Sequence, residues 1–174
     1  LLIISIISSC ATLFSIQYTL RYREESLARY YPFLLLLFAS IVGVVCTRDM
    51  LFFIAFWEIM TLTSYALVVF EKGKTAGVRA GFVYFLATHI ATACLIAAAI
   101  LLYTRTPAPH SFGFDALSAS LGTMMGKDSA LVHFILAMFF LGFVTKAGVL
   151  PFGFWLPGAY SAAPTGASAA FAGT

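Results

Sequence analysis

Long apolar stretches separated by short polar segments run along the whole chain. A helix needs roughly 20 apolar residues to cross the hydrocarbon core of a bilayer, and five stretches reach about that length. We therefore predict membrane-crossing helices over residues 1–20, 31–47, 51–70, 78–103 and 130–150. A sixth helix is expected to begin near Pro164, because proline suits the first turn of a helix.

The connections between these stretches differ in length and character. Arg48 and Asp49 make a very tight connection, so the helices on either side must be antiparallel neighbours. The linker over 104–129 is the longest and the least apolar, and it has room for a short surface helix over 115–121. The chain begins without Met and ends after a Pro/Gly/Ala-rich segment, so we interpret it as a fragment of a longer protein, with residues 1–174 forming a single transmembrane domain.

Composition supports the membrane interpretation and excludes other classes. The 174 residues are 61% hydrophobic and only 10% charged, whereas soluble domains carry about 25% charged residues. The fold class predicted is an all-α, polytopic transmembrane helical bundle. The net charge of +3 is small and dispersed, so no nucleic-acid partner is expected. The three cysteines show no metal-binding spacing, and we expect no metal or cofactor.

The positions of lysine and arginine predict an orientation, since such residues gather in cytoplasmic loops. The segments after the first and third stretches hold Arg21, Arg23, Arg29, Lys72, Lys74 and Arg79. Those after the second and fourth hold Arg48, Arg105 and Lys127. Loops 21–30 and 71–79 are therefore predicted to be cytoplasmic, with the chain starting on the outer face.

Glu58 is the sharpest chemical signal. It lies inside an apolar stretch, about 10 Å deep at 1.5 Å per residue. Ionisable groups at membrane depth are functional candidates by default, and burial penalises the charged form of a carboxyl, which suits uptake and release of a proton. The alternative is a structural carboxyl bonded to a neighbouring helix.

Two further ionisable residues lie in apolar stretches. Lys146 comes late in its stretch, and Pro151 should interrupt the helix beside it, because the proline ring clashes with the carbonyl of Ala147. Broken helices at membrane depth often form ion sites, although a lysine near a helix end can instead extend to the interface. His89 can donate and accept a proton at neutral pH, and Thr92, one turn away, is expected to hold a water or fix the imidazole tautomer. A satisfied core histidine is the alternative.

These residues resemble the motifs of a known family. The motifs are Phe56–Met60 with Ser64–Tyr65, and Lys146–Gly148 with Pro151–Phe152, Trp155–Pro157, Ala159, Ala163–Pro164 and Ser168. Over residues 30–174 they resemble the antiporter-like proton-translocating subunits of respiratory complex I, Mrp-type antiporters and group 4 nickel–iron hydrogenases. The segments around His89 and over 161–164 look most like the hydrogenase-4 and formate hydrogenlyase type. Gly158, in contrast, replaces a polar residue that is common in the family.

The resemblance implies a role for each residue. It implies part of a larger inverted-repeat transporter fold, in which about five to six helices are present here. By similarity, Glu58 and Lys146 form the charged pair of a proton pathway, and His89 lies between them in the relay. The implied partners are other membrane subunits of a hydrogenase or complex I-like assembly, with protons, or Na⁺, as the transported ions, in the cell inner membrane.

Three hypotheses of function follow. The first is a proton-translocating subunit of a redox-driven complex with no redox centre of its own. The second is a subunit of an Mrp-type cation/proton antiporter. The third is a scaffold in which the buried charges only hold helices together.

Overall fold

Eight α-helices make up the part of the chain that the computed structural model describes, residues 1–19, 27–70 and 75–173. They are α1 (Leu2–Thr19), α2 (Leu27–Cys46), α3 (Met50–Val68), α4 (Thr75–Tyr103), α5 (Phe114–Met124), α6 (Ser129–Lys146), α7 (Leu156–Ala162) and α8 (Thr165–Gly173). The predicted all-α fold class is confirmed. Of the expected loops 21–30 and 71–79, residues 21–26 and 71–74 lie outside the described residues, and the rest belong to the starts of α2 and α4.

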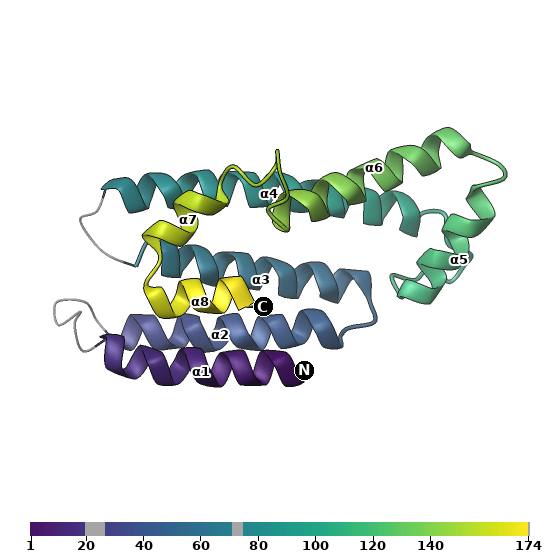
Figure 1. The fold of residues 1–174 in the computed structure, drawn as a ribbon. Coiled ribbons are helices and arrows are strands. Elements are labelled where there is room, and N and C mark those ends of the chain that lie inside the picture. The colour runs from purple at the N-terminus through teal and green to yellow at the C-terminus, as the bar shows by residue number, and fades with distance from the viewer. Residues whose placement is uncertain (20–26, 71–74, 174) are drawn as a thin grey trace.

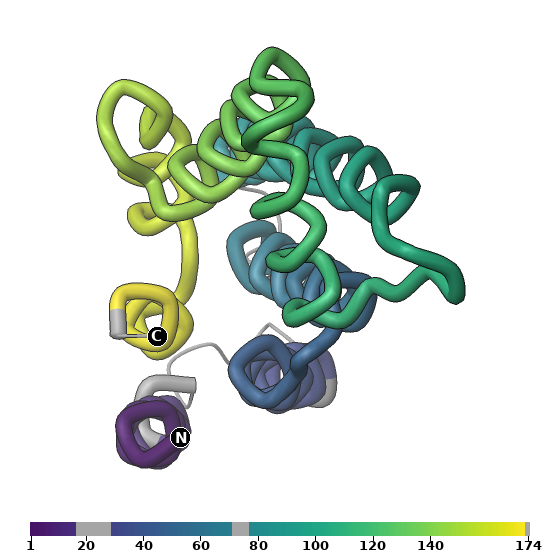
Figure 2. Tube along the Cα trace, turned by 90° about the vertical axis from the view of Figure 1, so that its right-hand side faces the viewer, coloured from purple at the N-terminus to yellow at the C-terminus, as the bar shows by residue number. Residues whose placement is uncertain are grey.

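The long helices run side by side along a common direction (Figure 1). Seen end-on in Figure 2, α1 and α2 occupy one side of the bundle, α3 the middle and α4 with α6 the far side. Helix α3 packs against α2 and α4, whereas α6 and α7 both pack against α4 and α8 packs against α1. Helix α3 is thus the central element from which side chains can reach several neighbours.

Four described helices are long and apolar enough to cross a membrane, with the spans Arg29–Cys46, Met50–Val68, Gly77–Tyr103 and Ser129–Lys146. The described apolar part of α1, Leu2–Ile16, is shorter than a full span. Many large apolar side chains point outward, among them Phe82, Phe140 and Leu150. An outer surface of this kind suits lipid rather than water.

The tight turn between α2 and α3 is built as the sequence predicts and is also joined to the long linker. The Asp49 carboxylate accepts hydrogen bonds from the backbone N–H groups of Leu51 and Phe52, which caps the start of α3. Asp49 also forms an isolated antiparallel bridge with Gly113. This bridge attaches the linker expected over 104–129 to the end of the α2–α3 hairpin. The linker contains α5, which is longer than the helix expected over 115–121.

The helix expected over 130–150 ends at Lys146, earlier than predicted. Gly148 has a φ of +71°, a left-handed conformation that favours glycine and ends helices. The Gly148 N–H donates to the Thr145 carbonyl, and the Val149 N–H donates to the Val144 carbonyl. Residues 147–155 then form a non-helical turn before α7, which the sequence did not predict, and α8 follows close to the expected position at Pro164. Figure 1 shows α6 ending about half-way along α4, with α7 beside the rest.

Gly142 lets α6 pack tightly against α4, and we expect Gly142→Ala to destabilise the protein. A Cβ there would lie 2.5 Å from Leu95 Cδ2 and 2.9 Å from the Ala91 carbonyl oxygen. Overpacking of this kind costs about 1–3 kcal/mol, so the melting temperature of the full-length protein in detergent should fall. Gly122→Ala in α5 is the matched control, because it meets nothing within 4 Å and should stabilise its helix by roughly 0.5–1 kcal/mol. Equal melting temperatures for the Gly142 variant and the wild type would contradict this packing.

Candidate functional site

Three ionisable side chains from three different helices meet near the middle of the bundle. Glu58 on α3 lies between the other two: its Oε1 is 3.3 Å from Lys146 Nζ on α6, and its Oε2 is 3.2 Å from His89 Nε2 on α4. The structure thus brings together all three residues predicted from the sequence. It corrects their order, because His89 was expected between Glu58 and Lys146, whereas the carboxylate occupies that position.

The three groups differ in their exposure. Only 4% of the Lys146 side chain is exposed, against 23% for Glu58 and 33% for His89. Lys146 therefore turns into the bundle, although it is the last residue of α6, and its ammonium points across to α3. Of the three groups, the Glu58 carboxylate and the His89 imidazole are the more exposed, and Lys146 is the most buried.

The hydrogen bonds of His89 define where a proton can reside. Its Nδ1 lies 2.9 Å from the Phe85 carbonyl oxygen, which can only accept, so Nδ1 carries a hydrogen. The contact between Nε2 and Glu58 Oε2 then contains one hydrogen at most. That hydrogen belongs either to an imidazolium facing a carboxylate or to a carboxylic acid facing a neutral imidazole. Glu58 and His89 can therefore exchange a proton without any rearrangement of the helices.

Of the two supporting residues predicted from the sequence, Thr92 does not contact the imidazole in the way that would fix its tautomer, whereas Pro151 lies where the helix is interrupted. Thr92 is buried, and its hydroxyl donates to the Thr88 carbonyl, so the Phe85 carbonyl rather than Thr92 holds the imidazole tautomer. Pro151 lies exposed in the turn after α6. Its place there agrees with the expected helix interruption, while Gly148 provides the local geometry that ends the helix.

The end of α6 is held in place by an aromatic side chain from the far side of the turn. Trp155 Nε1 donates to the Thr145 carbonyl at 2.9 Å, one residue before Lys146. The Trp155 ring packs on Tyr84 of α4, with ring centroids 4.9 Å apart. This link closes the 147–155 turn against α4 and keeps the Lys146 backbone beside α3.

Lys146 also contacts uncharged groups that sequence reasoning missed. Its Nζ donates to Thr61 Oγ1 at 2.5 Å and lies 3.5 Å from the Trp57 carbonyl oxygen. It also lies 5.3 Å from the centroid of the Trp57 ring. One signal was available in the sequence, because Thr61 follows Glu58 by three residues and so shares its helix face.

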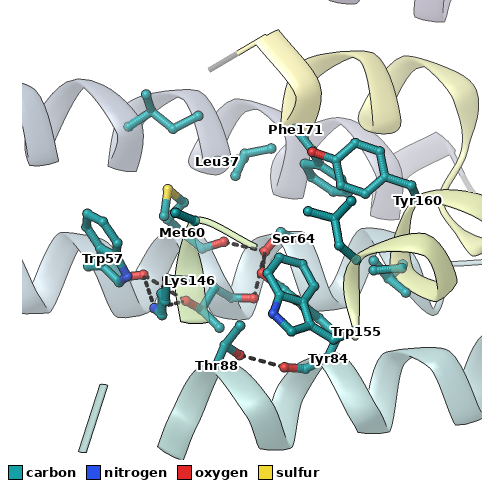
Figure 3. Close-up of a pocket in the computed structure, with 16 residues that line it drawn as sticks. Leu37, Trp57, Met60, Ser64, Tyr84, Thr88, Lys146, Trp155, Tyr160 and Phe171 are labelled. Carbon is teal, nitrogen blue, oxygen red and sulfur yellow. Dashed lines mark hydrogen bonds between the residues drawn. The ribbon is translucent and has the colours of Figure 1, made fainter. Parts of the chain in front are cut away.

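A cavity of about 350 Å³ begins at Lys146 and extends away from Glu58, toward α2, α7 and α8. Its polar wall includes the side chains of Thr61, Ser64, Tyr84, Thr88 and Tyr160, some of which are visible in Figure 3. The Ser64 and Tyr84 hydroxyls share a hydrogen bond of 2.5 Å. A cavity this large with several polar groups has room for ordered water molecules.

The arrangement as a whole can take up, hold and pass on protons. With Glu58 ionised, Lys146 charged and His89 neutral, the charges of the three groups cancel. One extra proton can then be shared by Glu58 and His89, and Lys146 can exchange protons with water in the cavity. Within residues 1–19, 27–70 and 75–173, no group of three His, Cys, Asp or Glu side chains is placed to hold a metal ion.

Comparison with known proteins gives a consistent result. A family model described as "NADH:quinone oxidoreductase/Mrp antiporter, TM" matches residues 47–174. Hydrogenase-4 component B of Escherichia coli (strain K12) is 33% identical over 172 residues, which cover 99% of this chain and 24% of that protein. The chain thus spans about a quarter of the length of this relative.

Two solved structures share the arrangement of helices. One is the membrane-bound sulfane sulfur reductase, an archaeal respiratory membrane complex, with a TM-score of 0.82 and 23% identity over 96% of this chain and 32% of that one. The other is the Mrp complex from Dietzia sp. DQ12-45-1b, with a TM-score of 0.74 and 24% identity over 98% of this chain and 31% of that one. At this level of identity the likeness shows the fold, and the chain is a multi-pass membrane protein.

Proposed function

The chain belongs to the NADH:quinone oxidoreductase/Mrp antiporter transmembrane family, and on this premise we propose that it is part of a proton-translocating subunit of a redox-driven membrane complex. Protons would move through Glu58, His89 and Lys146. Redox chemistry elsewhere in the complex would change the pairing of Glu58 with Lys146. Since the chain spans 24% of its hydrogenase-4 relative, activity and partners of the whole protein are part of this proposal.

One observation carries the proposal. A carboxylate on the central helix touches both a buried ammonium and an imidazole. A purely structural carboxylate needs one counter-charge, whereas this one also faces an imidazole, which can accept or donate a proton. The cavity of about 350 Å³ behind Lys146 would provide a route by which protons reach the three ionisable groups from the other side.

The similarity to hydrogenase-4 component B favours a hydrogenase or complex I-like assembly over other complexes. Other membrane subunits of such an assembly are the proposed partners, and the cell inner membrane is the proposed location. Loops 21–30 and 71–79 would face the cytoplasm, as the excess of lysine and arginine predicts. The complex would contribute the redox centres that provide the driving force.

A subunit of an Mrp-type cation/proton antiporter is the second candidate, favoured because the matching family also includes Mrp antiporters. The two candidates differ in what drives transport. An antiporter exchanges Na⁺ for protons without an electron donor, whereas a redox-driven pump requires one. A scaffold without transport is the third candidate, and it predicts neither activity.

Inverted membrane vesicles from cells that express the full-length gene with its neighbouring genes test this proposal. Formate, hydrogen and NADH are supplied in turn, and acidification of the lumen is followed with a quenched acridine dye. We expect at least one donor to acidify the vesicles, and deletion of the gene to remove the signal at unchanged sodium concentration. Sodium-dependent proton exchange without any donor would instead establish the antiporter, and no proton movement in either assay would refute both.

A further inference from the structure

Thr61 makes the shortest contact to the Lys146 ammonium. The Thr61 hydroxyl oxygen is 2.5 Å from Nζ, whereas the Glu58 carboxylate oxygen is 3.3 Å away. The Trp57 carbonyl and ring contact the same ammonium at 3.5 and 5.3 Å. Lys146 therefore rests against three uncharged, electron-rich groups of α3 in addition to its charged partner.

The Thr61 hydroxyl is oriented for this contact by its own hydrogen bond. It donates to the Trp57 carbonyl at 2.9 Å, so its oxygen can only accept a hydrogen from Lys146. The contact is therefore better suited to an ammonium, which has three hydrogens to donate, than to a neutral amine. None of these α3 groups titrates near neutral pH.

The Trp57 ring presents its face to Lys146 in an unusual setting. The ring packs with Phe53 and Phe143, and its Nε1–H is buried without an acceptor among the described residues. A buried donor without a partner is unfavourable. Phenylalanine could fill the same place in the aromatic cluster and has no N–H group to satisfy. Tryptophan, however, provides the strongest cation–π surface of the aromatic side chains, and its ring lies 5.3 Å from the Lys146 ammonium.

We propose that Trp57 and Thr61 form an uncharged cage that holds the Lys146 ammonium in place when Glu58 gives up its negative charge to a proton. This inference rests on the proposed function. Without the cage, protonation of Glu58 would leave the buried ammonium with only the uncharged Oε1 of a carboxylic acid as its partner on α3, and the cation would be lost or displaced. With it, Lys146 keeps its charge and its position while Glu58 shares a proton with His89.

The surroundings of Lys146 contain few other titratable groups. Glu58 faces it from α3, Tyr84 from α4 and Tyr160 from α7, the last two across the cavity. His89 reaches it only through Glu58. Helices α2 and α8 contribute apolar cavity residues, among them Leu37, Ile41 and Phe171. A change in the pH dependence of a Thr61 variant can therefore be assigned to the Lys146–Glu58 pair.

Thr61→Val tests the cage, because valine has nearly the same shape and lacks the hydroxyl. Proton translocation by the complete complex in vesicles is measured between pH 6 and pH 10, with assembly followed on native gels. We expect the alkaline half-maximum of translocation to move to lower pH by about one unit, equivalent to about 1.4 kcal/mol, because the ammonium loses a charge-assisted hydrogen bond. Thr61→Ser keeps the hydroxyl and should restore the wild-type profile.

Thr63→Val is the matched control. Thr63 is buried on the same helix and its hydroxyl bonds only to the Ile59 and Met60 carbonyls in the described structure, so its profile should match the wild type. Trp57→Phe is a second test, because the phenylalanine ring makes a weaker cation–π contact and should shift the profile in the same direction as Thr61→Val. If the Thr61→Val complex does not assemble, Trp57→Phe becomes the deciding variant. An unshifted profile in whichever of the two assembles would overturn the cage.

The outcome separates the cage from the proposed function. If Glu58→Gln stops translocation while Thr61→Val leaves the pH profile unchanged, the cage is wrong and the proton pathway stands. If Glu58→Gln translocates normally, the pathway itself is wrong, and the cage fails with it.

Discussion

Replacing Glu58 by Gln should abolish proton translocation and leave the complex assembled. Glutamine keeps the size of the side chain and can still accept from Lys146 and donate to His89, but it has no proton to exchange. Removing a proton-transfer group typically lowers a rate by about 100-fold or more, so vesicle acidification should fall by at least that factor. The measurement is dye quenching in vesicles, normalised to the amount of intact complex on native gels.

The contacts of this site explain why assembly should survive. Lys146 retains Thr61 and the Trp57 carbonyl as hydrogen-bond acceptors, so the ammonium is not left unpaired. Glu58→Asp is the control for the chemistry, because it keeps a carboxyl at a shorter reach and should retain part of the activity. Translocation at the wild-type rate in the Gln variant would remove Glu58 from the pathway.

Replacing Lys146 by Met should also stop translocation without loss of the complex. Methionine has a similar length and fits the apolar wall of the cavity, but it cannot hold or release a proton. Removing one partner of a buried ion pair usually costs about 3–5 kcal/mol, because the other charge is left uncompensated. Here Glu58 can relieve that penalty by sharing a proton with His89, whose Nε2 is 3.2 Å away.

The same variant separates transport from a scaffold role. A scaffold requires that assembly and activity fall together, whereas the proposed function requires activity to fall alone. Lys127→Met removes a positive charge from the exposed turn between α5 and α6, and it should change neither property. A parallel loss of assembled complex and activity in Lys146→Met would favour the scaffold.

The positions of the charges along their helices were predictable from the sequence. Glu58 and His89 each lie well inside a long apolar stretch, and the rise of 1.5 Å per residue converts that position into depth. The tight turn at Arg48 and Asp49 also predicted that α2 and α3 are antiparallel neighbours, and the two helices pack together. Chain position and apolar length are enough for inferences of this kind.

The end of α6 shows where local pattern was insufficient. Pro151 indicated an interruption near Lys146, but the apolar residues up to 150 favoured a longer helix. The left-handed Gly148 and the hydrogen bond from Trp155 to the Thr145 carbonyl end it at Lys146 instead. The apolar pattern could not predict this hydrogen bond, because tryptophan is common in membrane helices and nothing in the pattern shows which carbonyl its N–H will reach.

The sequence by itself determined that this is a membrane-embedded helical protein with a carboxyl, an amine and an imidazole buried in it, because apolar length and composition depend only on local residues. Tertiary structure alone decided that Glu58 lies between the other two and that Thr61 and Trp57 contact Lys146, which is 88 residues from Glu58. The physical reason is that the rotation of each helix about its own axis decides which side chains face the neighbouring helices. Helices α3 and α6 are apolar on nearly every side, so periodicity assigns no inward face. Only their packing against neighbouring helices, α2 and α4 for α3 and α4 for α6, determines where each polar side chain points.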